Sequence, residues 1–281
     1  MSAGSNKEAV NSAPATASAS LPTLSGGAIA AGCAASASHV AIEVVAETGS
    51  TNADLLARVD TLAGPVLLIA EAQTAGRGRA GRTWHSTPGA TLTFSLAWRF
   101  KGPLQRIAGL PLAVGVALAE TLHALSVPVQ LKWPNDLLRD GKKLGGILVE
   151  TQQSAGGELW AVIGAGINLV MPDELEAQIG RAVAAAPWLA QMDRNALMAA
   201  LLSRLAAVLA EFDDTGFAAF SGRWNRLHAW QGQPVCIVDH GATLHSGRAA
   251  GVDDSGRLQL DTDAGRVHIL SGDVSLRRVD P

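Results

Sequence analysis

A loop rich in glycine and arginine joins two strand-like segments, and this feature constrains the fold of the 281-residue chain more than any other. The loop, residues 76–84, reads Gly-Arg-Gly-Arg-Ala-Gly-Arg-Thr-Trp. An apolar run precedes it at 66–70, and residues 91–100 after it alternate apolar and polar side chains as a half-buried strand does. The pattern therefore predicts strand, loop and strand, with no helix directly after the glycines.

The glycine spacing of this loop also matches the G-x-G-x-x-G pattern of dinucleotide-binding folds. Such a site needs a helix after the third glycine and an acidic residue about 20 positions later. Here a strand follows the loop, and residues 72–119 contain no Asp or Glu. The context argues against a dinucleotide site and leaves two interpretations, a solvated basic loop or an anion-binding loop.

Positive charge is concentrated in the same acid-free stretch. Residues 72–119 carry six Lys and Arg side chains, although the whole chain has a formal net charge of −3. Local positive charge in an acidic chain favours a small anionic ligand over a nucleic-acid or membrane surface. A nucleotide phosphate fits this pattern.

Composition narrows the class of protein. The chain is 48% apolar, enough for a full core, and its longest apolar stretch, 107–119, is shorter than the ~20 residues that span a bilayer. We therefore expect no transmembrane helix. Cys33 and Cys236 have neither the number for a disulfide framework nor metal-ligand spacing, so we expect a reducing, cytoplasmic compartment and assign no metal ligands.

Three regions follow from the patterning. Residues 1–39 are rich in Ala, Ser and Gly without a period, which predicts a disordered low-complexity extension. Residues 40–230 combine strand-like runs with predicted helices after Ser50, over 110–125 and from Asp193, so an α+β domain is expected. Turn residues between the runs at 127–133, 143–150 and 159–169 predict antiparallel pairing. Residues 231–281 have short β segments typical of a small barrel.

Two further motifs carry candidate chemistry. In Lys132-Trp-Pro-Asn-Asp136, the proline delivers an amide and a carboxylate together at a strand end, where they suit an amine or a magnesium-bound phosphate. In Lys143-Leu-Gly-Gly146, an ammonium group projects over a patch without side chains. An ordinary turn and a strand bulge are the structural alternatives.

Four motifs in order, at 76–84, 132–136, 143–150 and Gly-Ala-Gly-Ile-Asn at 164–168, resemble the biotin protein ligases of bacteria. The resemblance covers residues 40–279 and includes Thr48–Asn52 and Glu71–Gln73. It implies an α+β catalytic domain of the class II synthetase-like type, with a mixed, largely antiparallel sheet and helices. It also implies a small C-terminal SH3-like β-barrel.

The resemblance further implies that MgATP activates biotin as biotinyl-AMP, and that a lysine of a biotin carboxyl carrier protein, in acetyl-CoA carboxylase or a related carboxylase, then accepts the biotinyl group. The residues it implies for catalysis are Arg79, Lys143 and Asp136. Those implied for biotin binding are Ser50, Thr51, Asn52, Gln73, Gly76, Arg77, Arg79, Lys143, Gly146, Gly164 and Gly166. Those implied for ATP or adenylate binding are Arg77, Arg79, Arg82, Trp84, Lys132, Asn135, Lys143 and Asn168.

Two other functions stay open at this point. A lipoate ligase or octanoyltransferase shares the fold and the lysine-centred acyl chemistry, and a biotin-sensing regulator would lack transfer activity. Residues 1–39 lack the length, helical periodicity and basic residues of a winged-helix domain, so we expect no DNA binding. A homodimer is neither required nor excluded. We expect the arginine loop to be mobile without ligand and to order around the adenylate.

Overall fold

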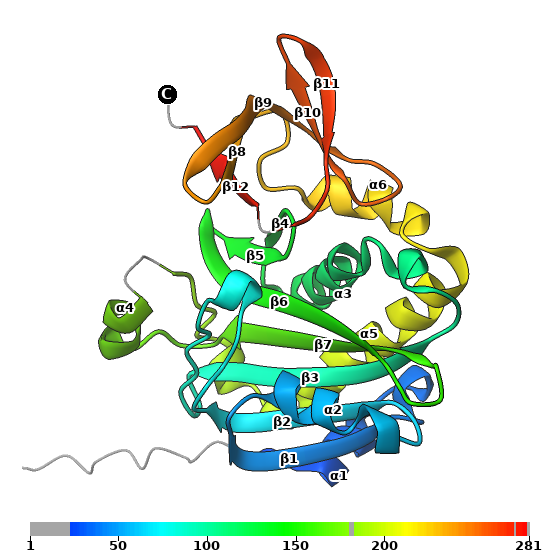
Figure 1. Ribbon diagram of the computed structural model, residues 1–281. Helices are drawn as coiled ribbons and strands as arrows, with labels where there is room; N and C mark the ends of the chain where they lie inside the picture. Colours follow the sequence, from blue (N-terminus) through cyan, green and yellow to red (C-terminus); the bar gives the residue numbers. More distant parts are fainter. Residues whose placement is uncertain (1–22, 180–182, 273, 280–281) are drawn as a thin grey trace, which may run out of the picture.

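The computed structural model describes residues 23–179, 183–272 and 274–279, and two sheets dominate it (Figure 1). The large sheet has the strand order β1-β2-β3-β7-β6-β5-β4, and the small one β11-β10-β9-β8-β12. The strands of the large sheet are β1 (Ala41–Thr48), β2 (Val66–Gln73), β3 (Thr91–Phe100), β4 (Gln130–Lys132), β5 (Asp136–Arg139), β6 (Lys142–Gln153) and β7 (Leu159–Asn168). Those of the small sheet are β8 (Pro234–Asp239), β9 (Ala242–Val252), β10 (Leu258–Thr262), β11 (Gly265–Ile269) and β12 (Ser275–Arg278).

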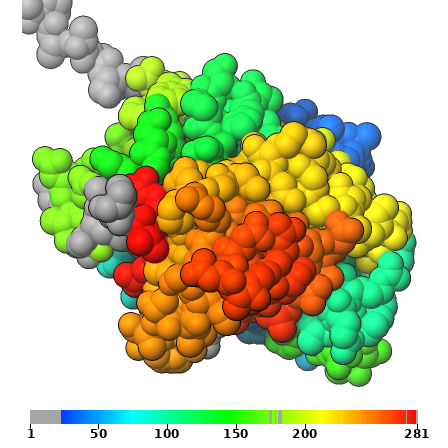
Figure 2. Space-filling model, turned by 90° about the horizontal axis from the view of Figure 1, so that it is seen from above, coloured from blue at the N-terminus to red at the C-terminus, as the bar shows by residue number. Residues whose placement is uncertain are grey.

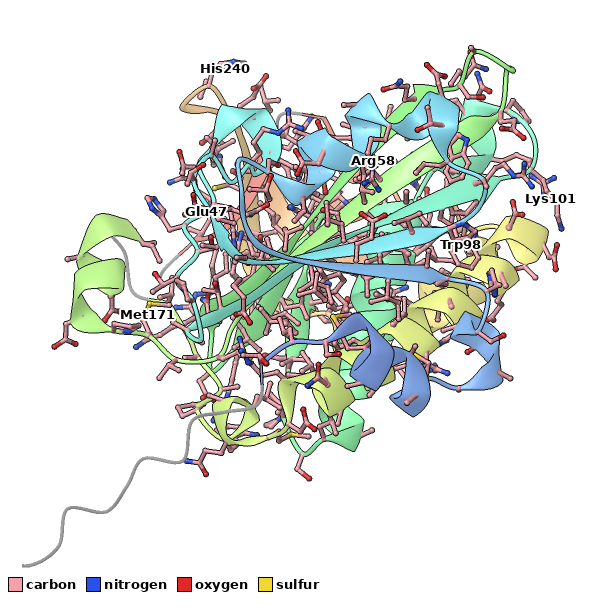
Figure 3. All side chains as sticks on the ribbon, turned by 90° about the horizontal axis from the view of Figure 1, so that it is seen from below. Glu47, Arg58, Trp98, Lys101, Met171 and His240 are labelled. Carbon is pink, nitrogen blue, oxygen red and sulfur yellow. The ribbon has the colours of Figure 1, made fainter. Side chains whose placement is uncertain are left out.

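Helices lie on both faces of the large sheet. The described helices are α1 (Gly26–Gly32), α2 (Thr51–Ala57), α3 (Leu110–Ala124), α4 (Asp173–Ile179), α5 (Arg194–Thr215) and α6 (Ala218–Leu227). In Figure 3, α2 lies with Arg58 on one side of the sheet, whereas α1 and α5 lie on the other, toward Trp98. The face of the sheet that α1, α3 and α5 cover holds the main apolar core.

Pairing in the large sheet is antiparallel except between β1 and β2. Two left-handed residues, Asp140 (φ 51°) and Gly141 (φ 74°), join β5 to β6, as the tight turns of hairpins require. The predicted α+β class with a largely antiparallel sheet is confirmed. Strand β5 was not predicted, because its first residues were interpreted as a turn.

The predicted long helix forms the centre of the core. Asp193 caps α5 by accepting from the Asn195 amide at 2.8 Å, and the apolar stripe of Leu197, Leu201, Leu205, Val208 and Phe212 is buried. Two stretches, Leu104–Ala124 and Arg194–Thr215, are long and apolar enough to cross a membrane by length and composition. Both are mostly buried against the sheet and neighbouring helices, and a core helix that is apolar all round passes the same test.

The prediction that residues 1–39 are disordered is wrong for the part that the structure describes. Ser25 caps α1, Ile29 is fully buried, and a turn at Ala35–Ala37 leads into β1. Glycines allow the tight packing: a Cβ on Gly26 would meet the Ile42 carbonyl oxygen at 2.8 Å, and one on Gly32 would meet Ala199 Cβ at 3.0 Å. Small residues interpreted as low complexity are thus helix-packing residues. Residues 1–22 lie outside the described part.

The C-terminal residues form a small antiparallel sheet, as the sequence indicated. From above, strands β8–β12 (orange to red) and α6 (yellow) form one continuous surface (Figure 2). The Asn225 side chain of α6 joins them, since it donates to the Val252 carbonyl at 3.1 Å and accepts from the Val252 amide at 2.7 Å. The buried Trp133 indole donates to the Gly256 carbonyl at 3.2 Å. These contacts join the C-terminal sheet to α6 and to the segment around Trp133.

Candidate active site

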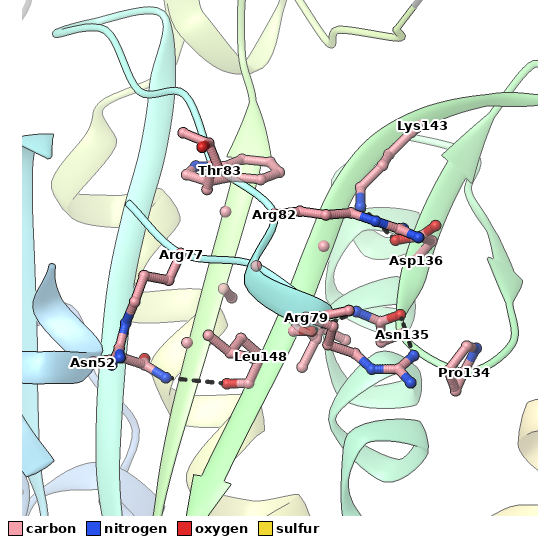
Figure 4. A pocket seen from close by; sticks show the side chains of 18 of the residues that line it. Asn52, Arg77, Arg79, Arg82, Thr83, Pro134, Asn135, Asp136, Lys143 and Leu148 are labelled. Atoms are coloured by element: carbon pink, nitrogen blue, oxygen red, sulfur yellow. Dashed lines mark hydrogen bonds and ion pairs between the residues drawn. The ribbon is translucent and has the colours of Figure 1, made fainter. Parts of the chain in front are cut away.

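A polar pocket lies on the face of the large sheet opposite α3 and α5. It is lined by residues of several elements and opens to solvent. Its walls come from α2, the arginine loop, the centre of the sheet, the Lys132–Asp136 segment and β12 (Figure 4). The predicted site residues among the lining are Ser50, Thr51, Asn52, Gln73, Arg77, Arg79, Arg82, Trp84, Lys132, Asn135, Asp136, Lys143, Gly146, Gly164 and Gly166.

Glycines make the floor of the pocket. Gly146 pairs with Gly166 across β6 and β7, and Gly164 lies between Leu148 and Ser95 in the next row. The space above these glycines is taken by other parts of the site. A Cβ on Gly164 would lie 2.4 Å from Asn52 Oδ1, and one on Gly166 would lie 2.3 Å from the Trp84 ring. No larger residue fits either position without moving the site.

A buried chain of hydrogen bonds crosses one end of the floor. The Thr51 amide donates to Gln73 Oε1 at 2.8 Å, and Thr51 Oγ1 lies 2.6 Å from Ser95 Oγ. Ser95 Oγ in turn lies 2.5 Å from Asn52 Oδ1. Thr51, Asn52 and Ser95 are each at most 3% exposed. Polar groups so deeply buried hold one geometry, which suits a neutral polar ligand group.

The sequence analysis missed two residues of this floor, Ser95 and Thr93. Both line the pocket, and both come from the strand predicted over residues 91–100. The available signal was the alternation of Thr and Ser with Leu and Phe, which places the hydroxyls together on the face opposite the core. It was interpreted only as a half-buried strand.

The arginine loop closes one side of the pocket. Backbone hydrogen bonds from Gly78 to Arg82 (2.7 Å) and from Trp84 to Gly76 (2.9 Å) fold it back on itself. Ala80 has φ 53°, a left-handed conformation that costs a residue with a Cβ free energy. The loop also reaches the C-terminal sheet, because Arg79 donates to the Gly272 carbonyl and Arg82 Nη2 lies 3.3 Å from Ser275 Oγ.

Two lysines meet one carboxylate at the other end of the pocket. Lys143 Nζ lies 2.5 Å from Asp136 Oδ1, and Lys132 Nζ lies 3.7 Å from Asp136 Oδ2 (Figure 4). Trp230, which the sequence analysis did not select, holds Lys132 Nζ 5.1 Å from its ring centre. Arg79 Nη1 donates to Asn135 Oδ1 at 3.1 Å, so the loop and the Lys132–Asp136 segment are in contact.

Trp84 packs inside the pocket on the glycine floor. Its ring lies against Gly166 and near Gly146, and its centre is 6.0 Å from Lys143 Nζ. Its indole nitrogen is buried and has no hydrogen-bond partner among the described residues. Trp84 is therefore an apolar wall between the cationic end of the pocket and the hydrogen-bonded end.

Two predicted contact residues do not line the pocket. Asn168 ends β7 and is 4% exposed, and its amide donates to the Ala184 carbonyl at 3.0 Å, so it holds the following segment in place. Gly76 lies at the base of the loop, where a Cβ would be 2.3 Å from the Trp84 carbonyl oxygen. Each of these residues serves the backbone, and direct ligand contact at Asn168 and Gly76 stays a prediction.

Metal ligands are few at the site. Asp136 is the one carboxylate among the lining residues of the pocket, and the described residues contain no cluster of three or more His, Cys, Asp or Glu. Magnesium commonly binds through one or two carboxylates together with substrate phosphates. The oxygens of Asp136 and Asn135 fit that mode, in which the metal arrives with a nucleotide.

Comparison with known proteins gives consistent results along the chain. Residues 42–168 match the biotin/lipoate A/B protein ligase family, and residues 232–277 match the biotin protein ligase C terminal domain. The bifunctional ligase/repressor BirA of Escherichia coli is 37% identical over 247 residues, which are 85% of this chain and 75% of that protein. The biotin--[acetyl-CoA-carboxylase] ligase of Mycobacterium tuberculosis is 37% identical over 244 residues, 83% and 88% of the two chains.

A solved structure agrees with these matches. The biotin protein ligase from Aquifex aeolicus in complex with biotin and ATP superposes with a TM-score of 0.70 at 30% identity, covering 85% of this chain and 99% of that one. Sequence and fold thus match over both the catalytic part and the C-terminal sheet. The polar floor, the arginine loop and the paired lysines all fall within the matched residues, and the chain belongs to the biotin protein ligase family.

Proposed function

We propose that this protein activates biotin with ATP as biotinyl-AMP and transfers the biotinyl group to a lysine of a biotin carboxyl carrier protein. The acceptor expected is the carrier of acetyl-CoA carboxylase or of a related carboxylase. One observation carries the proposal: a single pocket joins a hydrogen-bonded polar floor, with Arg77 beside it, to an end lined by two lysines and two arginines, Lys132, Lys143, Arg79 and Arg82. Biotin has a neutral ureido ring and a carboxylate, and ATP adds the phosphates.

In the first step, a carboxylate oxygen of biotin attacks the α-phosphorus of ATP. A P–O bond forms to the carboxylate, and the bond to the β-phosphate oxygen breaks, so that pyrophosphate leaves. Both reactants are anions, and the developing charge needs fixed cations. Lys143, Arg79 and Arg77 supply them, while Thr51, Asn52 and Gln73 hold the ureido ring.

In the second step, the amine of the carrier lysine attacks the carbonyl carbon of the mixed anhydride. A C–N bond forms and AMP leaves with both electrons of the C–O bond. The attacking lysine must first lose a proton, because an ammonium ion has no free pair. Asp136 is the carboxylate within the pocket that accepts it, once the ligand phosphate draws Lys143 and Lys132 away.

The nucleotide enters between the arginine loop and the Lys132–Asp136 segment. Arg79, Arg82, Lys132 and Asn135 face this space, and Trp84 separates it from the ureido end. Asn135 and Asp136 would hold magnesium that arrives with the triphosphate, where the ion would offset phosphate charge. The loop excludes water from the adenylate when it orders, because an exposed mixed anhydride would hydrolyse.

The test is transfer of labelled biotin to a purified acceptor domain with MgATP. Lys143→Ala and Arg79→Ala should each lower kcat/KM by about 100-fold or more, the loss that follows removal of one transition-state donor. Lys142→Ala is the matched control, since Lys142 is exposed on the same strand and absent from the pocket lining. A native protein that transfers no biotin, or variants with native rates, would refute the proposal.

ATP–pyrophosphate exchange separates the alternatives. Exchange that depends on biotin and not on lipoate supports the ligase, and the reverse supports a lipoate ligase. Lipoyl-type chemistry without ATP would indicate an octanoyltransferase. We further propose that the protein does not bind DNA and acts in the cytoplasm, where the free thiols of Cys33 and Cys236 stay reduced. A gel shift at low salt and sedimentation with biotinyl-AMP test DNA binding and a homodimer.

A further inference from the structure

Glu150 lies outside the pocket lining, yet it contacts two groups that build the pocket. It is on β6, in register with Gly146 and Leu148 on the site face of the sheet. Its Oε2 accepts from Asn52 Nδ2 at 2.8 Å and lies 3.2 Å from Arg77 Nη2. One carboxylate oxygen therefore connects the buried floor to the arginine loop.

The chemistry of a carboxylate decides how the Asn52 amide is oriented. An ionised carboxylate only accepts hydrogen bonds, so the Asn52 nitrogen has to face Glu150 and the Asn52 oxygen has to face Ser95. Ser95 must then donate its only hydroxyl proton to Asn52 Oδ1 (2.5 Å). In the 2.6 Å contact between Thr51 and Ser95, the donor is consequently Thr51.

The direction of the protons from Asn52 to Thr51 thus follows from the acceptor oxygen that Glu150 presents to Asn52 Nδ2. Gln73 Oε1 accepts from the Thr51 amide at 2.8 Å and lies 3.1 Å from Thr51 Oγ1, so the one Thr51 hydroxyl proton is shared between Ser95 and Gln73. Without an acceptor at position 150, Asn52 Nδ2 would keep only its weak 3.4 Å contact with the Leu148 carbonyl oxygen, and the opposite orientation of Asn52 would become accessible. The floor would then offer a mixture of donors and acceptors to a ligand.

The same oxygen holds the arginine loop. Arg77 is about half-exposed and its partner side chain is 30% exposed, so this ion pair is weak and easily exchanged. A ligand anion in the pocket competes for the Arg77 guanidinium. When Arg77 leaves, Glu150 keeps its bond to Asn52 and the floor does not change.

We propose that Glu150 is a positioning residue of this site: it orients the Asn52 amide in the floor and holds the arginine loop, through Arg77, until an anionic ligand takes the arginine. The inference rests on the proposed function for the identity of the ligand. The loop contact itself does not depend on that identity. The test of the loop contact between Glu150 and Arg77 therefore includes a measurement without any ligand.

Two substitutions separate the two roles. Glu150→Gln keeps an oxygen that accepts from Asn52 but removes the charge that pairs with Arg77, whereas Glu150→Ala removes both. Glu158→Gln is the matched control, because Glu158 also pairs with an arginine, Arg99, at a half-exposed position outside the pocket lining. All three variants are compared with the native full-length protein.

The first measurement is amide hydrogen exchange of residues 76–84 without ligand. Exchange should be about two- to fivefold faster in both Glu150 variants, the factor that a half-exposed ion pair supports, and unchanged in Glu158→Gln. Exchange equal to native in both Glu150 variants would overturn the role in holding the loop. This result stands whether or not the protein uses biotin.

The second measurement is the KM for biotin and the kcat in ATP–pyrophosphate exchange. Glu150→Ala should raise the KM about 10-fold, since it leaves the buried Asn52 amide nitrogen with only its 3.4 Å contact to the Leu148 carbonyl oxygen, and change kcat less than about threefold. Glu150→Gln should restore the KM to within about threefold of native. Equal KM values in both variants, or a loss confined to kcat, would overturn the positioning role. A native protein without biotin-dependent exchange would refute the proposed function instead.

Discussion

Along β7, neighbouring residues face two different environments. The side chains directed at α3 and α5 belong to the main core, and they are Leu159, Ala161, Ile163, Ala165 and Ile167. On the other face, Trp160 and Val162 join a small apolar cluster under α2, and Gly164 and Gly166 then form the pocket floor. One strand thus contributes stability with one face and a binding surface with the other.

The two faces of β7 tolerate different substitutions. Side chains on the core face fill space, and a smaller residue there leaves a cavity. On the site face, Gly164 and Gly166 leave space for Asn52 and Trp84, so a larger residue there disturbs the pocket. The two kinds of substitution should therefore be separable on adjacent residues of this strand.

The largest effect is expected on the core face. Ile163→Ala should lower the free energy of unfolding by about 2 to 5 kcal/mol, through lost burial and the cavity left behind. Ile163 is fully buried in the main cluster. Urea unfolding measures the loss, and the KM for biotin should stay within about twofold of native. A loss below about 1 kcal/mol would mean that the core relaxes around the gap.

A substitution of Gly164, the next residue on β7, should lower activity and leave stability nearly unchanged. A Cβ at Gly164 would lie 2.4 Å from Asn52 Oδ1, so Gly164→Ala must displace Asn52. We expect kcat/KM for biotin to fall at least about 30-fold, or about 2 kcal/mol, with little change in the urea midpoint. Gly156→Ala is the control, since its Cβ would meet only Ser154 Oγ at 3.6 Å. Native activity in Gly164→Ala would show that the two faces are not distinct.

A smaller effect should appear at the edge of the core face. Ile29 of α1 is fully buried in the main cluster, although it lies near the N-terminal limit of the described residues. Ile29→Ala should cost about 1 to 2 kcal/mol, less than a central substitution, because α1 can open locally without global unfolding. Exchange of the α1 amides should increase in parallel. Unaltered unfolding and exchange would contradict the docking of α1.

The smallest effect is expected from the protonation of a buried histidine away from the pocket, His228. Burial lowers the pKa of His228, which packs 4.7 Å from Trp224, and the hydrogen bond to Gln231 opposes this shift only in part. The neutral form is thus favoured on folding. The associated stability is complete above the unfolded pKa of about 6.5 and decreases as the pH falls toward the lower folded pKa.

Urea unfolding between pH 7.5 and 5.5 measures this dependence. His228→Gln should remove part of the decrease, by up to about 1 kcal/mol, and leave the contribution of other groups. Identical pH profiles for the native protein and His228→Gln would contradict the buried neutral histidine. The site face differs, because its charges at Lys132, Asp136 and Lys143 are paired and partly solvated.

Part of this site was predictable from sequence. The motifs selected all the charged side chains that line the pocket, because these arginines and lysines are concentrated at short spacing beside glycines. Ser95 and Trp230 were missed, since a serine in a strand and a single tryptophan have many uses. Asn168 and Gly76 were assigned contacts by family resemblance, and the fold uses them to hold backbone segments.

The sequence by itself determined many of the elements, among them β2, β3, α3 and α5, together with the alternation of two faces on each strand and the class of ligand, since local spacing and charge encode these properties. It did not determine that Ser25–Gly32 would dock on α5, because a helix of small residues shows little hydrophobic signal until a partner surface exists. Only the tertiary structure decided that Glu150, Asn52 and Arg77 meet. Their hydrogen bonds join residues up to 98 positions apart, and such pairings depend on strand register rather than on local spacing.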